Sequence, residues 1–338
     1  MSVTLVTGAA GHLGANIVRA LVRAGRRVRA LVHTDARALE GLPVERVHGD
    51  VTVPDTVSSA MQQVGVVYHL AGLITLRSDD DERAQAVNVD GVAHVARAAL
   101  DARVRRFIHF SSVEADLTHD QPVTAGRAPT TSPYGAYGRS KAKGDEVVAT
   151  LVANGLPAIT LRPTGVLGPF DVKPSLMGRF LLGLAHGRFP WLVQGGFDWV
   201  DARDVAETAV RAETSGRIGE RYLVTGTWAS LLELARGAGE VGGFAPPTRV
   251  VPMWLARVGA HLVEAGSAVV GRTPLWTPGA LARVAGRARF DGAQAKAELG
   301  HHARPLDETL RDTFAWYRTV GMLPVATPTG PHAHHDGI

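Results

Sequence analysis

Tyr137 and Lys141 are the residues whose types and spacing point most directly to chemistry. They stand four positions apart in Tyr137-Gly-Arg-Ser-Lys141, inside a segment, Tyr137 to Asn154, whose pattern predicts a helix. That spacing places both side chains on one helix face. A lysine ammonium beside a phenol favours the phenolate and lowers the phenol pKa from about 10. The pair is therefore predicted to exchange a proton with a carbonyl or alcohol oxygen near neutral pH.

Neighbouring polar residues belong to the same candidate centre. Phe110-Ser111-Ser112 ends a predicted strand, where a hydroxyl donor would orient the substrate oxygen and stabilise charge as hydride moves. Tyr134 is a competing phenol, but Gly138 stands four residues beyond it, so it has no lysine partner. An isolated Tyr-x-x-x-Lys spacing is more often an exposed helical pair. The assignment therefore depends on companion motifs.

A glycine-rich turn follows the first predicted strand and opens the first predicted helix. Its sequence is Thr7-Gly8-Ala9-Ala10-Gly11-His12-Leu13-Gly14. In a dinucleotide-binding turn one glycine permits the sharp turn, one lets backbone amides approach the pyrophosphate, and one lets helix and strand pack closely, which we expect of Gly14. The helix N-terminus attracts the phosphate charge. Glycine turns also serve purely structural ends, so the motif alone is a weak indicator.

The first half of the chain alternates strand and helix patterns. Such a rhythm predicts an α/β fold, a Rossmann-type doubly wound parallel sheet. The predicted strands are Val3 to Thr7, Val28 to Val32, Val44 to Val47, Val64 to Leu70, Phe107 to Phe110 and Pro157 to Leu161. Predicted helices include Asn16 to Ala24, Ala84 to Ala102 and Tyr137 to Asn154.

The rhythm breaks after Pro169, where glycines, prolines and aromatics precede mainly helical patterns. We expect a smaller, mainly helical C-terminal substrate lobe. The predicted Rossmann domain covers residues 1–169 and about 196–227, and the lobe covers about 170–195 and 228–323. Residues 324–338 are rich in proline, histidine and glycine and are expected to form a flexible tail.

Five further motifs occur in one order along the chain. They are Gly49-Asp50-Val51, His69-Leu70-Ala71-Gly72, Asn88-Val89-Asp90-Gly91, Arg162-Pro163-Thr164-Gly165-Val166-Leu167-Gly168-Pro169 and Trp199-Val200-Asp201-Ala202-Arg203-Asp204-Val205-Ala206. With the glycine turn and the Tyr-Lys pair, this series resembles extended short-chain dehydrogenases/reductases, the NAD-dependent epimerase/dehydratase family. The resemblance covers about residues 3 to 320. It is nearest to hopanoid-associated sugar epimerase-like proteins, which share a stretch like Gly168 to Ser175, and to dihydroflavonol-4-reductase-like and 3β-hydroxysteroid-dehydrogenase-like enzymes.

The resemblance implies a role for each matching residue. It implies catalytic roles for Ser112, in preference to Ser111, and for Tyr137, Lys141 and Asn88. It implies cofactor contacts for Gly8, Gly11, His12, Leu13, Gly14, His33, Arg37, Asp50, Val51, Ala71, Gly72, Tyr137, Lys141, Pro163, Thr164 and Val166. Lys141 would also hold the nicotinamide ribose, and Asn88 would support the helix and the proton path.

The end of the second predicted strand bears on the choice of cofactor. NAD enzymes usually place an acidic residue there, but this chain has Ala30-Leu31-Val32-His33-Thr34. The missing carboxylate removes a repulsion against the NADP 2′-phosphate. His33, with Arg37 and His12, is the candidate phosphate neighbour, although a solvent-facing histidine is nearly as good an interpretation. Asp35 offers a carboxylate to the ribose if its loop bends inward, so we favour NADP and keep NAD open.

Composition limits the classes of partner and compartment. The formal net charge of +4 comes from scattered arginines rather than basic runs, which argues against nucleic acid. The chain has no cysteine, so thiolate metal sites are excluded, and we expect no metal. No apolar stretch reaches the length of a membrane span, and Met1 leads directly into a strand pattern, so a cytoplasmic protein is expected. A homodimer through the helices near Ala84 and Tyr137 is implied by the resemblance only.

Several other aromatic, apolar and histidine residues are expected to serve in packing or to lie in solvent. Trp254 and Trp276 border the helical portion and are expected in the lobe core in preference to lining a substrate pocket. Met177, Phe180, Leu181 and Leu184 stand at helical spacing and either contact substrate or pack the lobe. His301-His302 is interpreted as a solvated turn, and His332, His334 and His335 as a solvated tail.

Three hypotheses for function follow. The first is an NAD(P)-dependent oxidoreductase that reduces a ketone or aldehyde, or oxidises the matching alcohol, with Tyr137 as acid/base. The second is a nucleotide-sugar epimerase or dehydratase that keeps and recycles its cofactor. Against a dehydratase, Val113-Glu114 follows Ser112 where that group tends to have Asp-Glu. The third is a dinucleotide-sensing regulator without turnover, against which the intact Ser112, Tyr137 and Lys141 argue.

Overall fold

The protein is built around a seven-stranded parallel sheet, as the strand and helix alternation predicts. The computed structural model describes residues 2–74, 81–116, 123–124, 135–260, 278–285 and 289–324. The sheet has the order β11-β7-β5-β4-β1-β2-β3, with parallel neighbours throughout. Its strands are β1 (Val3–Thr7), β2 (Val28–Val32), β3 (Glu45–His48), β4 (Val64–His69), β5 (Arg106–Phe110), β7 (Ala158–Pro163) and β11 (Arg221–Val224).

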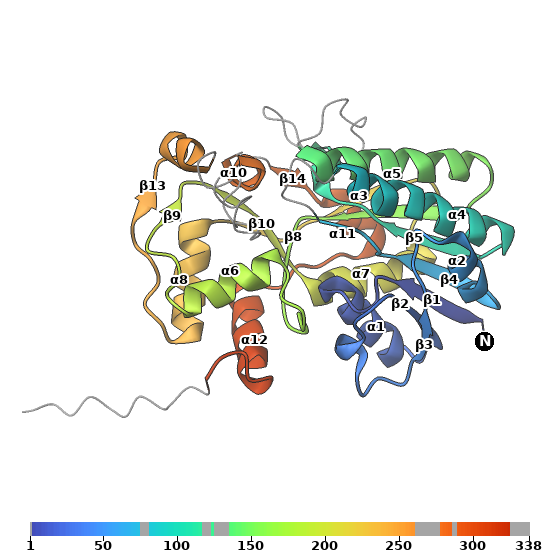
Figure 1. Ribbon diagram of the computed structural model, residues 1–338, viewed down its shortest axis with the longest axis horizontal. Coiled ribbons are helices and arrows are strands. Elements are labelled where there is room, and N and C mark those ends of the chain that lie inside the picture. The colour runs from blue at the N-terminus through green and yellow to red at the C-terminus, as the bar shows by residue number, and fades with distance from the viewer. Residues whose placement is uncertain are drawn as a thin grey trace, which may run out of the picture.

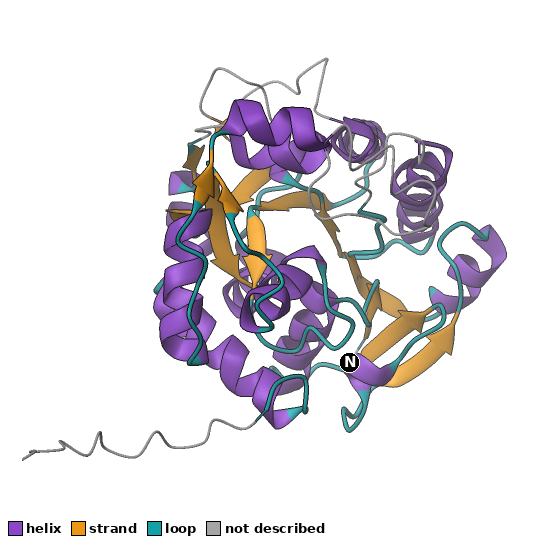
Figure 2. Ribbon diagram, turned by 60° about the vertical axis from the view of Figure 1, so that its left-hand side comes forward, coloured by secondary structure: helices purple, strands orange, loops and turns teal. Residues whose placement is uncertain are grey.

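The strand order reverses between β1 and β4, and helices cover both faces of the sheet (Figures 1 and 2). One face is covered by α1 (His12–Arg23), α7 (Ala202–Ser215) and α11 (Ala293–Leu299). The other is covered by α2 (Pro54–Ala60), α4 (Gly91–Asp101) and α5 (Gly135–Ala153). In a doubly wound sheet, ligands bind beyond the carboxyl ends of the strands at such a reversal.

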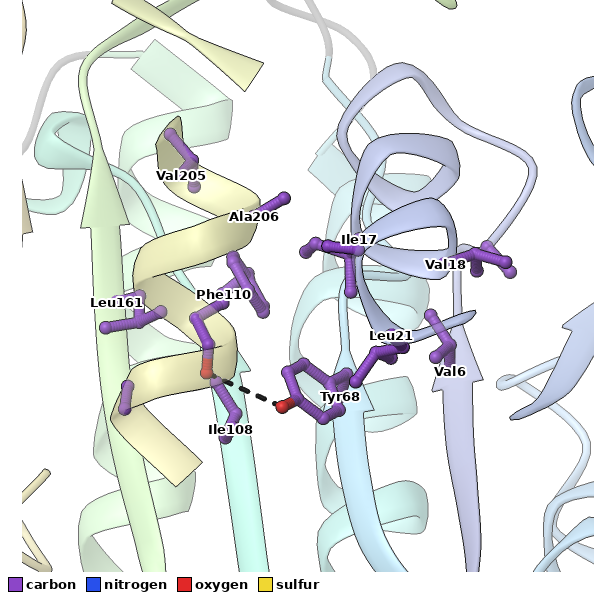
Figure 3. Close-up of a cluster of buried hydrophobic side chains, with 14 of the residues drawn as sticks. Val6, Ile17, Val18, Leu21, Tyr68, Ile108, Phe110, Leu161, Val205 and Ala206 are labelled. Atoms are coloured by element: carbon purple, nitrogen blue, oxygen red, sulfur yellow. Dashed lines mark hydrogen bonds between the residues drawn. The ribbon is translucent and has the colours of Figure 1, made fainter. Parts of the chain in front are cut away.

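The core under α1 and α7 fixes the end of the sheet where a ligand would bind. Ile17 and Leu21 of α1, Ala206 of α7 and Tyr68 of β4 belong to one buried cluster (Figure 3). All four are fully buried or nearly so, and each large apolar side chain buried in this way contributes about 1.5–3 kcal/mol. The Tyr68 hydroxyl donates to Glu213 at 3.1 Å, so the phenol is buried with a partner. The packing holds the N-terminus of α1 against β1.

A smaller region follows the break in rhythm and lies on the left of Figure 1. Its helices are α6 (Leu176–Ala185), α8 (Leu231–Gly242), α10 (Pro278–Ala285) and α12 (Leu306–Thr319). Short strands lie in and beside this region. β8 (Gly165–Leu167), β10 (Gly196–Asp201) and β12 (Thr227–Ser230) form one sheet, β9 (Leu192–Val193) pairs with β13 (Val250–Val251), and β14 (Phe290–Asp291) pairs with β6 (Val123–Thr124). Phe180, Leu181 and Leu184 are buried in the core of this region.

The helix predicted over Ala84 to Ala102 is interrupted. It begins as α3 (Asp81–Gln85), continues through one π-helical stretch, η2 (Ala86–Asp90), and resumes as α4. The π-helical stretch contains Asn88, and such bulges are frequent at functional sites. Two short 3₁₀ turns, η1 (Arg37–Leu39) and η3 (Val113–Ala115), follow β2 and β5.

Two expectations about individual side chains were wrong. Trp254 is 69% exposed instead of lying in the lobe core. His301 is buried instead of solvated, because its Nδ1 lies 2.8 Å from the Thr208 hydroxyl and its Nε2 lies 2.6 Å from the Thr225 carbonyl oxygen. His302 is exposed. Other predicted positions lie outside the described residues: Tyr134, Trp276, the tail histidines His332, His334 and His335, and residues 325–338.

None of the described helices is long and apolar enough to cross a membrane.

Candidate active site

A cavity of about 410 Å³ opens at the carboxyl ends of β1, β4, β5 and β7 and extends to the smaller region. The structure brings most of the predicted residues to its wall: Gly8, Gly11, His12, Leu13, Gly14, Gly72, Ser112, Tyr137, Lys141, Pro163, Thr164 and Val166. Its wall does not include Asn88, His33, Arg37, Asp50, Val51 or Ala71. The cavity therefore unites the glycine turn with the Ser-Tyr-Lys residues.

The glycine turn has the shape that a dinucleotide requires. Gly8 has a φ of +66°, which favours glycine, and a Cβ on Gly14 would lie 2.1 Å from the Gly8 carbonyl oxygen. Gly11 is the N-cap of α1 and leaves the first amides without a side-chain cap, and the first turn carries no acidic residue. These amides and the positive end of the helix dipole fit a pyrophosphate.

We predict that Gly14→Ala abolishes tight cofactor binding and destabilises the fold. The added methyl group meets backbone atoms of Gly8 and Ala9, which cannot move aside as a side chain does. Overpacking of this kind costs on the order of 1–3 kcal/mol. Fluorescence titration with NADPH and urea denaturation measure both effects. Gly259→Ala is the matched control, because a Cβ there meets nothing within 4 Å, and unchanged binding in Gly14→Ala would refute the packing role.

Ser112, Tyr137 and Lys141 converge at the carboxyl end of β5. The Ser112 hydroxyl forms a hydrogen bond with the Tyr137 phenol and accepts one from the Glu114 amide at 3.2 Å. The Lys141 ammonium donates to the Phe110 carbonyl oxygen at 2.7 Å. Burial lowers the pKa of Lys141 to about 8, against the opposing effect of the Asp145 carboxylate. Ser111 also lines the cavity, and its hydroxyl donates to Asp145 at 2.9 Å.

The environment of Tyr137 differs from the sequence-based expectation. Burial raises the pKa of Tyr137 above its usual value, and the Glu114 carboxylate raises it further. The groups that lower this pKa are the Ser112 hydroxyl and the Arg283 guanidinium, whereas the Lys141 ammonium is directed to the Phe110 carbonyl. Arg283 lies 5.7 Å from the centre of the Tyr137 ring. In this structure the cation that opposes the raised phenol pKa is therefore an arginine from the smaller region.

Asn88 joins the loop under the cavity to helix α5. Its Oδ1 accepts from the Leu73 amide at 2.8 Å, and its Nδ2 donates to the Leu73 carbonyl at 2.9 Å and to the Ser140 hydroxyl at 2.9 Å. Both amide protons are thus engaged. The contacts support the predicted role of Asn88 in holding the helix that carries Tyr137 and Lys141.

A buried ionic network lies beneath Lys141. Arg162 of β7 is fully buried and binds the carboxylates of Asp116 and Asp145, the latter at 2.5 Å. Asp145 stands four residues after Lys141 on α5, and its Oδ1 also lies 3.2 Å from the His109 Nε2. Burial raises the pKa of Asp145 to about 7, while Lys141 lowers it. The network ties helix α5 to β5 and β7.

The predicted residues at the adenosine end contact one another. His33 Nε2 lies 3.3 Å from the Asp50 carboxylate, and Arg37 forms an exposed pair with Asp35 at 2.7 Å. That pair holds the pKa of Asp35 at about 2, chiefly through the Arg37 hydrogen bond. His12 lies apart from this exposed group, since its Nε2 lies 3.0 Å from the Gly168 carbonyl oxygen at the cavity wall.

Sequence reasoning did not assign roles to Glu114, Asp145 or Arg283. Asp145 has a signal, since it shares the helix face of Lys141 one turn further on. Glu114 and Arg283 stand 169 residues apart and meet only in the folded chain, where the Arg283 Nε donates to the Glu114 carboxylate at 2.6 Å. No local pattern predicts such a contact.

Comparison with known proteins agrees with this geometry. The family model described as "NAD dependent epimerase/dehydratase family" matches residues 4–225. The chain is 35% identical to sterol demethylase protein B of Methylococcus capsulatus, over 95% of this chain and 99% of that one. It is 29% identical to a putative dihydroflavonol 4-reductase of Synechocystis, over 94% and 95%.

Among solved structures, a nucleoside-diphosphate-sugar epimerase from Pseudomonas aeruginosa is 26% identical over 95% of this chain and 98% of that one, with a TM-score of 0.76. The fold, the glycine turn and the family match agree with one another. The chain therefore belongs to the NAD-dependent epimerase/dehydratase family of extended short-chain dehydrogenases/reductases and is an NAD(P)-dependent oxidoreductase of that family.

Proposed function

We propose that this protein reduces a lipophilic ketone or aldehyde, or oxidises the matching alcohol, with Tyr137 as the acid/base. The observation that carries this proposal is the composition of the cavity. Ser112, Tyr137 and Lys141 line one end, and the smaller region supplies an apolar wall opposite them, formed by Leu176, Met177, Phe180, Phe197, Trp199, Leu231 and Val284. An apolar wall facing a few convergent polar groups is typical of a site for a mainly apolar ligand.

The same wall argues against a nucleotide sugar. A diphosphate requires cations or free backbone amides at its binding site. Among the described lining residues from the smaller region, Arg283 is the one cation, and the Glu114 carboxylate already binds it. The names of the curated relatives, a sterol demethylase component and a dihydroflavonol reductase, also support a lipophilic substrate.

The chain's own residues account for binding and proton transfer. Gly8, Gly11 and Gly14 would hold the dinucleotide pyrophosphate, and Lys141 the ribose next to the nicotinamide. The nicotinamide, when bound, supplies or accepts hydride. The Ser112 hydroxyl orients the substrate oxygen, and Tyr137 donates its phenolic proton as the carbonyl oxygen becomes an alcohol. In oxidation the proton moves in the opposite direction.

Loss of absorbance from reduced nicotinamide tests this function. Purified protein is mixed with NADPH or NADH and with a panel of steroidal and long-chain ketones, aldehydes and nucleotide sugars. We expect reduced cofactor to disappear in step with alcohol formation from lipophilic carbonyls. Conversion of a sugar without net change in cofactor would instead support the epimerase.

The epimerase is the second candidate, because the Pseudomonas aeruginosa relative in fold is a nucleoside-diphosphate-sugar epimerase and the same triad serves both reactions. A dinucleotide-sensing regulator is the third, and binding of cofactor without turnover of any substrate would support it. The presence of Ser112, Tyr137 and Lys141 in one cavity supports an enzyme.

We propose NADP as the preferred cofactor, with NAD as the alternative. The phosphate neighbours are His33 and Arg37, and Arg37 must release Asp35 to reach a 2′-phosphate.

We expect Arg37→Ala to weaken NADPH binding a few-fold, as for one exposed charge contact, and to leave NADH binding unchanged. Asp35→Asn should strengthen NADPH binding. Calorimetric titration of both cofactors measures this, and an affinity for NADH equal to or above that for NADPH in the wild type would overturn the preference.

The homodimer and the domain boundaries remain predictions. Light scattering on the purified protein tests the first, with a mass near 72 kDa expected for two chains of 35.8 kDa. Limited proteolysis tests the second, and cleavage beyond residue 323 is expected if the tail is flexible.

A further inference from the structure

A largely buried ion pair, Arg283 with Glu114, lies beside the Tyr137 ring. The Arg283 Nε donates to the Glu114 carboxylate at 2.6 Å, with 15% of the Arg283 side chain and 13% of the Glu114 side chain exposed. Both line the cavity with Tyr137. The guanidinium carbon lies 5.7 Å from the ring centre, within the range of a cation–π contact.

The two members of the pair come from different parts of the molecule. Glu114 lies on η3, two residues after Ser112, so its position is set by the end of β5. Arg283 lies on α10 of the smaller region, on the same helix as the wall residue Val284. The pair therefore links the proposed substrate wall to the proposed acid/base residue.

We propose that Glu114 and Arg283 are positioning residues for Tyr137. Their opposite charges set the proton affinity of the Tyr137 hydroxyl, and this proton affinity therefore depends on the placement of helix α10. This inference rests on the proposed role of Tyr137. Neither residue needs to touch substrate for it to hold.

The charges oppose one another in their effects on the phenol. The Glu114 carboxylate disfavours a phenolate and raises the pKa of Tyr137, whereas the Arg283 guanidinium favours it and lowers that pKa. Among the described residues, the other titratable groups around this centre are Lys141 and Asp145 on α5, His69 and His109 on the sheet, and Arg162 with its partner Asp116. Lys141 donates to Phe110, and Asp145, which also raises the pKa of Tyr137, binds Arg162. Arg283 is the cation that lies over the ring, and Glu114 is its carboxylate partner.

Removal of each charge should move the pH profile in opposite directions. In carbonyl reduction the phenol is the proton donor, so kcat/KM falls as pH rises through its pKa. Glu114→Gln should move this alkaline limb down by about one pH unit or more, and Arg283→Met should move it up. Glu114 stays ionised at the alkaline pH of the limb, so its effect persists in Arg283→Met. The double variant should return toward the wild type, and Arg283→Lys should stay near it.

Controls separate tuning from damage to the fold. Arg311→Met removes an exposed arginine on α12 that binds Asp307, and it should leave the profile unchanged. Circular dichroism and NADPH affinity verify that each variant is folded. Ultraviolet difference titration of the cofactor-free protein gives a second readout: Glu114→Gln should show a phenol that ionises at lower pH, which is absent when Tyr137→Phe is added.

The outcomes distinguish this inference from the proposed function. The role of the pair would be overturned if the alkaline limb of the kcat/KM profile moved in the same direction in Glu114→Gln and Arg283→Met. It would also be overturned if the limb failed to move in one of these two variants. If Arg283→Met does not fold, the titration of Glu114→Gln decides the matter alone. Retention of activity in Tyr137→Phe would instead overturn the proposed function itself.

Discussion

Tyr137→Phe should lower kcat/KM by a factor of about 10² to 10⁴, the usual contribution of general acid/base catalysis. The phenol lies in the cavity beside Ser112 and Lys141, and the change removes the transferable proton without changing the ring. Cofactor affinity should stay close to that of the wild type, because the glycine turn is untouched. Steady-state kinetics and fluorescence titration with NADPH measure the two quantities.

Tyr222→Phe is the matched control for this prediction. Tyr222 lies on β11, and its hydroxyl donates to Glu298 at 2.7 Å away from the cavity. Loss of that hydroxyl should reduce stability by about 1 kcal/mol and leave kcat/KM unchanged. If Tyr137→Phe keeps most of its activity, Tyr137 is not the acid/base and another donor must be sought at the cavity wall.

Arg162→Met should destabilise the protein by about 3–5 kcal/mol, the usual effect of breaking a buried ion pair by removal of one partner. Arg162 is fully buried, and its removal leaves Asp116 and Asp145 without their cation. The free energy of unfolding, measured by urea denaturation and circular dichroism, reports the effect. The loss should be smaller at acidic pH, because burial raises the pKa of Asp145 to about 7 and protonation of this carboxyl relieves the penalty.

Two further variants make the origin of this effect clear. Arg162→Met with Asp145→Asn should recover part of the stability, because one of the two unpaired charges is gone. Arg311→Met, which breaks an exposed pair, should cost at most about 1 kcal/mol. A loss below 1 kcal/mol in Arg162→Met would show that the buried network does not hold α5 to the sheet.

The parts of the fold that sequence patterns predict are those with local causes. Strands β1, β2, β4, β5 and β7 are short apolar runs in a sheet buried on both faces, and glycines mark the ends of several neighbouring helices. The glycine turn was located by its position between β1 and α1. Helix spacing and the ordered companion motifs predict the pairing of Tyr137 with Lys141, and the structure places both in one cavity.

The parts that sequence patterns miss depend on distant contacts. The π-helical stretch at Asn88 is held by Leu73 and Ser140, which a helical period does not encode. His301 is buried because its two ring nitrogens form hydrogen bonds with the Thr208 hydroxyl and the Thr225 carbonyl oxygen. Trp254 is exposed, although tryptophan is usually found in a core. Arg283, which lies over the Tyr137 ring, comes from helix α10, in the part of the chain with the weakest pattern, and its partner Glu114 stands 169 residues earlier.

The most direct test of the central claim is the transfer of deuterium to a lipophilic ketone from NADPH that carries deuterium at both positions of the nicotinamide C4. The account predicts one deuterium at the carbinol carbon of the product for each cofactor oxidised, detected by mass spectrometry, with Tyr137→Phe strongly impaired in the same assay. Conversion of a nucleotide sugar with no deuterium released from solution cofactor, and no turnover of any ketone, would contradict it.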